Sequence, residues 1–381
     1  MERDELAGWL RLTLTPGVGA LTARRLLACC GLPEAIFGTG AWYDCVTPAQ
    51  ASALAQEPEE LPALLETTWQ WLRAREDGVA RAVITLADTR YPPALLATED
   101  PPVLLYVMGA PALLACAAPF PQRCLAMVGS RSPTAQGAVH ARQFAQALRA
   151  AGLCIVSGLA LGVDGAAHEG ALEGAPESPP EGEAATIAVI GTGLDRVYPS
   201  RHRALAHRIA RHGLVVSEYP LGTPPLPANF PKRNRIIAGL SQGTLVVEAA
   251  LQSGSLITAR LAAEQGREVF AIPGSIQSPQ SRGCHALIRQ GAKLVETAQD
   301  VLEELRLPAP EQPQKPQKPT AAPAPENALL TALGHDPMGL DALVARTGMA
   351  AADLQVALLE LELDGQVARL PGGLFQRVGL G

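Results

Sequence analysis

From residue 81 to about 307, short apolar runs alternate with amphipathic runs of helical length. The helical periodicity is clearest at 134–151 and 201–212. The apolar runs have the length and β-branched content of strands, and they read RAVITLA, VLLYVMG, CLAMVGS, LCIVSG, TIAVIGTG, LVVSE, TLVVEA, EVFAIPG and AKLVE. Continuous apolar strands separated by helices are typical of a parallel sheet that is covered on both faces. The pattern therefore predicts an α/β domain with an extended Rossmann-like parallel sheet over 81–307.

The segment before this pattern, residues 1–80, is predicted to be a small helical domain. In Leu12–Leu27 (LTLTPGVGALTARRLL) an apolar stretch meets the turn PGVG and then a helix that carries Arg24 and Arg25. This is the layout of a SAM/helix-hairpin-helix-like domain, in which amides at the start of the second helix can contact a phosphate. An ordinary helical hairpin packed on its neighbour explains the same pattern, and both interpretations stay open.

The segment after the pattern begins with a proline-rich linker at 308–325, whose composition predicts an extended, semi-rigid chain. Residues 326–381 then predict a small winged helix. A first helix ends near 333, a second ends at the turn Thr347-Gly348-Met349, a third runs to Asp364, and a hairpin turns at 371–373.

The third helix of this winged helix carries the wrong charge for reading DNA. From Ala350 to Asp364 it has four acidic residues and neither Lys nor Arg. A helix in the major groove needs cations for the phosphates, because phosphate contacts dominate DNA affinity. We therefore expect this module to contact protein or to stabilise an oligomer.

The overall charge excludes a protein that coats nucleic acid by bulk charge. The 381 residues carry a formal net charge of -6, so any nucleic-acid site must be a local patch. The seven cysteines are odd in number and form no C-x-x-C pair, which indicates reduced thiols in a cytoplasmic protein. The chain starts without a signal-peptide core. The uncharged stretch 101–122 is interrupted by prolines, so no membrane segment is expected.

Small and hydroxyl residues recur where the predicted strands end. In a doubly wound sheet, ligands bind at the carboxyl ends of the strands near a topological switch point, and small residues let backbone amides approach an anion there. The candidates are Gly129, Ser130 and Arg131 after the third run, Ser157 and Gly158 after the fourth, and Glu248, Ser253, Gly254, Ser255 and Thr258 after the seventh. Ser255 is also a suitable N-cap for the helix that follows, so capping alone explains that residue.

Common cofactor and metal patterns are missing from the sequence. Gly191-Thr192-Gly193 lacks the third glycine of a dinucleotide fingerprint, and no phosphate-binding G-x-x-x-x-G-K-[ST] loop is present. No nucleotide cofactor is therefore expected. His202, His207 and His212 are scattered round one helix, which disfavours a metal site. Asp164 and His168 share a helix face, but no nucleophile accompanies them, and we prefer a cap and an interior histidine to an acid–base pair.

A dense basic motif follows the sixth run. In FPKRNR, Phe230 precedes Lys232, Arg233, Asn234 and Arg235, and no acid lies between Glu218 and Glu248. Cations on the first turn of a helix add to its positive end, and an aromatic ring beside them is a platform for a base. With Arg131 from the neighbouring strand end, these residues predict a groove for a single nucleic-acid strand. Phe230 in the core, or an arginine paired with Glu248 or Asp164, are the alternatives.

Several long motifs, in order, resemble one family: VGSR, SGLALGVDGAAH, YP, GLVVSEYP, FPKRNRIIAGLS, VVEAALQSGSLITA and AIPG. They closely resemble DNA processing protein A (DprA, also called Smf). The resemblance implies a non-enzymatic protein that binds single-stranded DNA taken up in natural transformation, protects it, and helps to load a RecA-type recombinase. It also implies a homodimer through the Rossmann-like domain, and a single-strand-binding protein is a further candidate partner. The strand-end residues and Phe230–Arg235 would then line the DNA groove.

One feature of the sequence departs from the pattern of the family, and another resembles a different class of protein. Family members carry cations just before the Phe, whereas Thr223–Asn229 has none, and Lys232 inside the motif can compensate. The run QGTLVVEA also faintly resembles the loop of phosphoribohydrolase-like nucleotide N-glycosidases, with Glu248 as the acid–base residue. Release of a free base would identify such an enzyme. A scaffold that only bridges partners would show no DNA affinity in the central domain.

Overall fold

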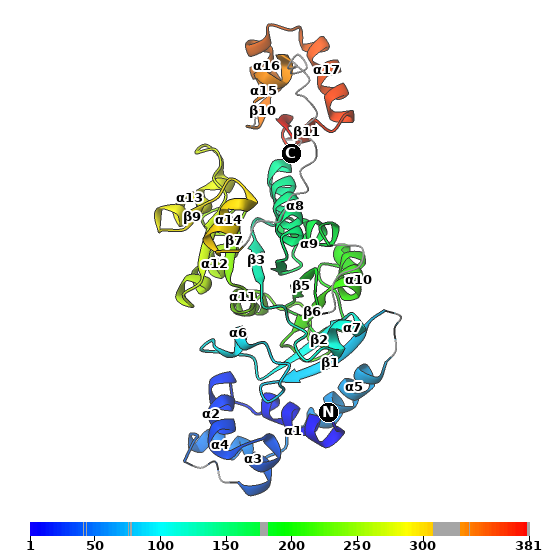
Figure 1. Cartoon of the computed structure of the whole chain (residues 1–381), viewed down its shortest axis with the longest axis vertical. Helices are drawn as coiled ribbons and strands as arrows, with labels where there is room; N and C mark the ends of the chain where they lie inside the picture. Colours follow the sequence, from blue (N-terminus) through cyan, green and yellow to red (C-terminus); the bar gives the residue numbers. More distant parts are fainter. Residues whose placement is uncertain are drawn as a thin grey trace.

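A nine-stranded sheet forms the centre of the molecule in the computed structural model (Figure 1). The structure describes residues 1–378 except 41, 43, 75, 77, 176–181, 308–327 and 335, so the linker predicted at 308–325 lies outside the described residues. Each of the nine predicted runs forms a strand. The strands are β1 (Ala80–Thr85), β2 (Leu104–Gly109), β3 (Cys124–Val128), β4 (Cys154–Ser157), β5 (Thr186–Val189), β6 (Leu214–Ser217), β7 (Gly243–Val246), β8 (Glu268–Ala271) and β9 (Lys293–Leu294).

The direction of β2 differs from the prediction. The strand order is β1-β2-β6-β5-β4-β3-β7-β8-β9. All pairs from β6 to β9 are parallel, as a Rossmann-like sheet requires, but β1 pairs with β2 and β2 with β6 in antiparallel register. The prediction of a parallel sheet is therefore wrong for this edge. Apolar runs indicate burial and not direction, and open α/β sheets commonly carry antiparallel edge strands.

Helices cover both faces of the sheet. On one face lie α8 (Ala135–Ala150), α9 (Val163–Glu173), α10 (Arg203–His212) and α14 (Ala298–Glu304), and on the other lie α11 (Asn229–Leu240), α12 (Ser255–Glu264) and α13 (Arg282–Arg289). The alternation along β3 decides which core each side chain joins. Leu125 and Met127 pack with α8 and α9, whereas Ala126 and Val128 pack with α11. Short elements complete the connections: α6 (Pro93–Leu96), α7 (Pro111–Ala115), η1 (Ser200–His202) and η2 (Pro279–Ser281).

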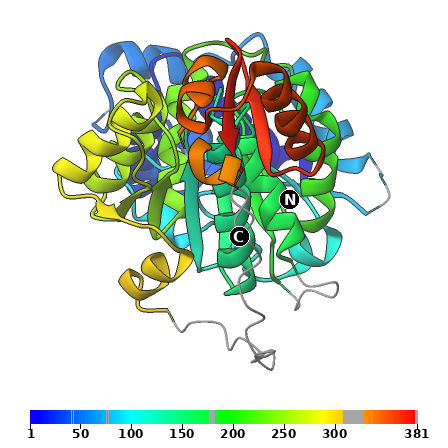
Figure 2. The same ribbon diagram turned by 90° about the horizontal axis from the view of Figure 1, so that it is seen from above.

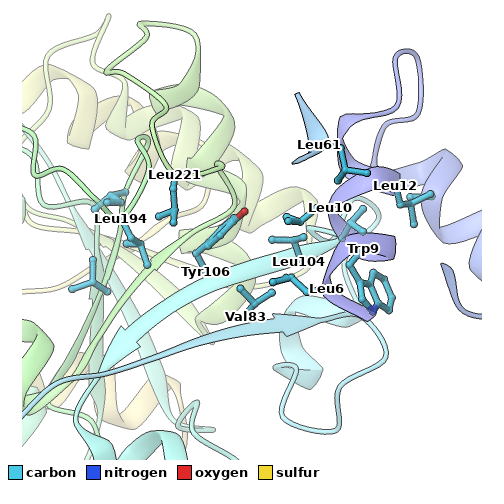
Figure 3. Packing of buried hydrophobic residues seen from close by; sticks show 14 of the residues in the cluster. Leu6, Trp9, Leu10, Leu12, Leu61, Val83, Leu104, Tyr106, Leu194 and Leu221 are labelled. Carbon is cyan, nitrogen blue, oxygen red and sulfur yellow. The ribbon is translucent and has the colours of Figure 1, made fainter. Parts of the chain in front are cut away.

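The N-terminal helices pack against the antiparallel edge of the sheet. They are α1 (Arg3–Leu14), α2 (Ala20–Cys30), α3 (Pro33–Thr39), α4 (Pro48–Leu54) and α5 (Leu61–Arg73). Leu6 and Leu10 of α1 belong to the same buried cluster as Val83, Leu104 and Tyr106 of β1 and β2 (Figure 3). The predicted hairpin between the first two helices is present. One of its arginines serves the fold, because Arg24 donates a hydrogen bond to the carbonyl of Thr98 at 3.2 Å.

The C-terminal module is the predicted winged helix, and it lies at the opposite end of the molecule from the N-terminal helices (Figure 1). Its elements are α15 (Ala328–Leu333), β10 (Met338–Gly339), α16 (Leu340–Thr347), α17 (Ala351–Leu363), β11 (Val367–Leu370) and β12 (Leu374–Arg377). The three strands form one sheet in the order β10-β12-β11, which Figure 2 shows beside the two longer helices. Gly348 ends α16 in the left-handed conformation, at φ +68°, where a residue with a Cβ would be strained.

Among the described residues, no single helix is both long and apolar enough to cross a membrane. The pair α16 and α17 passes this test of length and composition together, but it is bent by 107°.

Candidate nucleic-acid interface

A groove of about 740 Å³ opens where the strand order reverses. The chain proceeds outward from β3 in one direction and from β7 in the other, so the loops that follow these two neighbouring strands diverge and leave a crevice. A hydrogen bond of 2.7 Å from the amide of Ser130 to the carbonyl of Glu248 ties the two loops at their base. Ten of the predicted residues line the groove: Gly129, Ser130, Arg131, Phe230, Arg233, Asn234, Ser253, Gly254, Ser255 and Thr258.

Two aromatic rings and one guanidinium form a stack along one wall of the groove. Phe230, at the start of α11, is half-buried and is therefore not a core residue. The Cζ of Arg131 lies 5.7 Å from the centre of its ring, and the ring of Tyr198 lies 5.6 Å from it, centre to centre. Tyr198 is 49% exposed. The stack presents planar, polarisable surfaces to the groove, which suits a flat ring in the ligand.

Packing against Phe230 explains the glycine at position 191, in the motif Gly191-Thr192-Gly193. A Cβ at Gly191 would lie 3.1 Å from Cδ1 of the Phe230 ring, which is tighter than an ordinary contact. The side-chain amide of Asn229 donates to the carbonyl of Gly191 at 3.1 Å. This glycine therefore lets the aromatic ring lie against the backbone that follows β5.

The floor of the groove is the start of α12. Gly254 is the N-cap residue and Ser255 the first helical residue, so the prediction that Ser255 caps the helix is wrong. The hydroxyl of Ser255 instead lies 2.6 Å from that of Ser253. No acid lies in the first turn to oppose the positive end of the helix dipole, but the first amides, those of Ser255, Leu256 and Ile257, already donate to Ser253 and Gly254. Asn234 holds this floor against α11, since its amide donates to the carbonyl of Gly254 at 3.3 Å.

Arg233 lines the groove but is buried in its wall, which it supports. Its side chain is buried and donates to the carbonyl of Val189 at the end of β5. Burial lowers the pKa of Arg233 to about 10, and the nearby carboxylate of Asp164 opposes that shift. Burial likewise raises the pKa of Asp164 above its usual value, against the effect of Arg233. The alternative of a motif arginine paired with Glu248 or Asp164 is not found among the ion pairs of the described residues, and Arg233 acts on Asp164 only through its nearby charge.

The other two cations of the motif point elsewhere. Arg235 forms ion pairs with Glu218 and, at 3.2 Å, with Asp100, so its charge is balanced inside the protein. Lys232 is exposed but does not line the groove. Arg131, by contrast, is exposed, lines the groove, and takes part in none of the ion pairs found among the described residues.

Three of the predicted residues support the groove from outside it. Glu248 accepts hydrogen bonds from the amide of Thr134 at 2.9 Å and from its hydroxyl at 2.6 Å, at the start of α8. A Cβ at Gly137 would lie 2.4 Å from this carboxylate, so the helix start and the acid fit closely. Ser157 is buried and donates to the carbonyl of Met127 at 2.6 Å, which links β4 to β3. Gly158 leaves room for the guanidinium of Arg233.

Asp164 and His168 do not form an acid–base pair. Asp164 accepts hydrogen bonds from the amides of Gly158 at 3.1 Å and Ala160 at 3.3 Å, so it holds the loop after β4. His168 is fully buried, with Nδ1 2.7 Å from the hydroxyl of Thr186. Burial lowers the pKa of His168 to about 3. The interior-histidine interpretation fits, but the prediction that Asp164 caps the helix is wrong, because Gly162 is the N-cap residue of α9 and Asp164 lies within the first turn.

Sequence reasoning missed some of the groove's residues. Tyr198 belongs to the YP motif, but its position after a loop gave no sign that it would stack on Phe230. Gln252 and Gln280 also line the groove, and the Gln280 amide lies 3.4 Å from the carbonyl of Ser132. Such residues lie in loops without periodicity, and only their contacts reveal them. No group of three or more His, Cys, Asp or Glu among the described residues is arranged to hold a metal ion.

The fold and site together define an α/β protein with a doubly wound sheet between a helical module and a winged helix, and with Arg131, Phe230 and Tyr198 in a groove at the switch point of the sheet. The match to known families is specific. Residues 82–306 match the model of DNA recombination-mediator protein A, and residues 313–373 match that of the DprA winged helix domain. The chain belongs to the DNA recombination-mediator protein A family.

Relatives and solved structures agree with this assignment. Protein Smf of Escherichia coli (strain K12) is 46% identical over 292 residues, which cover 74% of this chain and 74% of that protein. The X-ray structure of DNA processing protein A from Streptococcus pneumoniae has a TM-score of 0.64 at 39% identity, covering 80% of this chain and 98% of that one. A structure that describes the single-stranded DNA binding mode of the Helicobacter pylori protein has a TM-score of 0.50 at 31% identity, covering 59% and 95%.

Proposed function

We propose that this protein binds single-stranded DNA in the groove at the switch point and acts as a recombination mediator. The observation that carries the proposal is the stack of Arg131, Phe230 and Tyr198 above the floor at Ser253–Ser255, which carries two hydroxyls. Unpaired bases stack on aromatic rings, and phosphates bind to cations and hydroxyls. A duplex hides its bases, so this wall favours a single strand. The relative from H. pylori, described by its single-stranded DNA binding mode, supports the same ligand.

Within the groove, we assign the stacking to Phe230 and the phosphate contact to Arg131. Arg131 is exposed there and takes part in none of the ion pairs among the described residues. Lys232 is exposed beside the groove and is a candidate for a flanking phosphate. The remaining candidates hold the walls of the groove in position. The side chains of Arg233, Arg235, Ser157 and Glu248 bind partners within the protein, and the missing side chain at Gly158 leaves room for Arg233.

A charge placed in the floor of the groove tests this site. Ser253→Glu puts a carboxylate where a phosphate would lie and should weaken binding of a labelled single-stranded oligonucleotide about tenfold or more, because like charges repel at short range. Ser52→Glu, in exposed α4, makes the same change in net charge and should bind like the wild type. Equal binding by the two variants would contradict a groove at this place.

The mediator role extends to partners. We propose that a RecA-type recombinase receives the bound strand, that a single-strand-binding protein is displaced in the process, and that the protein acts in the cytoplasm as a homodimer through its Rossmann-like domain. The family, named for recombination mediation, supports this role. Recombinase filaments should assemble faster on coated single-stranded DNA when the protein is added. Unchanged assembly rates would contradict the role.

We further propose the division into domains at 1–80, 81–307, the linker 308–325 and 326–381, and a role without catalysis. A nucleotide N-glycosidase is less favoured, because the carboxylate of Glu248 is bound at the start of α8 rather than presented to the groove. Incubation with nucleoside monophosphates should release no free base. Release that Glu248→Gln abolishes would instead favour the enzyme.

A further inference from the structure

The exposed half of α10 is entirely basic apart from one alanine. Along one helical arc lie Arg203, His207, Arg211, Ala204, Arg208 and His212, all exposed. The opposite arc, with Leu205 and Ile209, is buried against the sheet. Arg201 in η1 extends the basic arc, and residues 196–217 contain no Asp or Glu. We call Arg201, Arg203, Arg208 and Arg211 the basic strip.

The fold accounts for only part of this charge. Arg208 and Arg211 are like charges at i and i+3, which destabilises a helix, and Arg203 in the first turn opposes the helix dipole, whereas Arg211 in the last turn interacts favourably with it. None of the four arginines takes part in an ion pair among the described residues. Glu76 pairs with Arg81 and also lies 3.6 Å from Nδ1 of His207, and Glu173 pairs with Arg142, so neither acid forms an ion pair with the four arginines. A chain with net charge -6 thus maintains a local surface of opposite sign.

The basic strip is continuous with the groove. Tyr198, which stacks on Phe230, is followed after one residue by η1 and then by α10. His202 of η1 contacts the carbonyl of Leu159 at 3.0 Å, and the next residue in that loop, Ala160, lines the groove. The strip therefore begins at the rim of the groove and follows α10 away from it, over about 15 Å for ten residues.

We propose that the basic strip is an extension of the DNA path, along which a single strand that leaves the groove past Tyr198 continues over α10. This inference rests on the proposed function. Arginine binds phosphate oxygens in a two-pronged geometry, and a row of arginines suits a row of phosphates. An acidic protein surface is the rival occupant. Protein interfaces have an apolar centre, whereas no large apolar side chain is exposed on α10.

The test compares two lengths of labelled single-stranded oligonucleotide on the full chain. One, of about 6 nucleotides, fills only the groove, and one of about 20 also reaches the strip. The variant carries Arg203→Gln, Arg208→Gln and Arg211→Gln together. A matched control carries Arg123→Gln, Arg260→Gln and Arg346→Gln together, three exposed arginines outside the strip. Fluorescence anisotropy over a salt series gives affinity and salt slope, and thermal melting confirms that each variant is folded.

The wild type should bind the long oligonucleotide more tightly and with a steeper salt slope than the short one. The α10 variant should lose about 2 units of that slope, at about 0.7 per phosphate contact, and keep the affinity for the short oligonucleotide. The control should match the wild type. The extension is refuted if the α10 variant keeps the wild-type salt slope for the long oligonucleotide, or if the control loses as much of that slope. It is also refuted if the α10 variant changes only in its self-association, measured by sedimentation, which would favour an acidic protein surface as the occupant. Failure of the wild type to bind even the short oligonucleotide would instead overturn the proposed groove itself.

Discussion

At the scale of single residues, Arg233 and Gly158 are packed against each other in the wall of the groove. A Cβ at Gly158 would lie 1.9 Å from Nη1 of Arg233, which is far inside any permitted contact. We predict that Gly158→Ala destabilises the protein by about 1–3 kcal/mol, the usual cost of overpacking. Urea unfolding measures this. Gly38→Ala, where nothing lies within 4 Å of an added Cβ, is the control and should leave stability unchanged or slightly raised. Equal stability of the two variants would contradict the packing.

The burial of His168 makes the free energy of unfolding depend on pH. Burial lowers its pKa to about 3 in the folded protein, from 6.5 in the unfolded chain. Its contribution to stability is therefore fully present above pH 6.5 and is lost as the pH falls toward 3. Where only the unfolded chain binds the proton, the unfolding equilibrium changes about tenfold per pH unit.

We predict that His168→Gln flattens the loss of stability between pH 7 and 5, whatever its stability at pH 7. Urea unfolding at several pH values measures the slope. His212→Gln, at an exposed site, should keep the wild-type slope. A His168→Gln slope as steep as that of the wild type would show that this histidine is charged, and not neutral, in the folded state.

The motif's location could be predicted from its residues, but the directions of its side chains could not. A basic motif at a helix start after a strand must lie at the carboxyl edge of the sheet, and Phe230 and Asn234 do line the groove there. Arg235 turns away because its partners are Asp100 and Glu218. Those acids are remote in sequence, and no local pattern links them to the motif.

At the scale of elements, α17 combines acids with an exposed apolar stripe. Val356, Leu359 and Leu363 are 59%, 55% and 80% exposed, and the helix carries neither Lys nor Arg. We predict that Leu359→Ser with Leu363→Ser leaves the affinity for single-stranded DNA within about twofold of the wild type, because phosphate contacts need cations. Anisotropy measures this. A loss as large as that of a groove variant would place DNA on the winged helix.

The existence of each strand could be predicted, because β-rich apolar runs between helices are a strong signal. The strand directions at the edge formed by β1 and β2 could not be predicted. β2 has the composition of a buried strand like the others, yet it runs antiparallel to both of its neighbours, β1 and β6, at the edge that the N-terminal helices cover. The composition of a run indicates that the strand is buried, whereas the direction of the strand depends on what packs beside it.

At the scale of the whole molecule, the N-terminal helices and the sheet share one core. The cluster of Figure 3 joins α1 and α5 to β1 and β2, so these parts should unfold together. The assembly beyond one chain is a proposal drawn from the family. We predict that sedimentation of the full chain at micromolar concentration gives twice the mass of 39.8 kDa. A single species at 39.8 kDa would contradict the homodimer.

The central claim is that Arg131 and Phe230 hold one strand of DNA, one by charge and the other by stacking. The most direct measurement is anisotropy of a labelled single-stranded oligonucleotide over a salt series, for the wild type, Arg131→Ala and Phe230→Ala, with Arg123→Ala as control. Arg131→Ala should flatten the salt slope by about 0.7. Phe230→Ala should weaken binding by about 1–3 kcal/mol with the slope unchanged. A wild type that does not bind, or groove variants that match the control, would contradict the account.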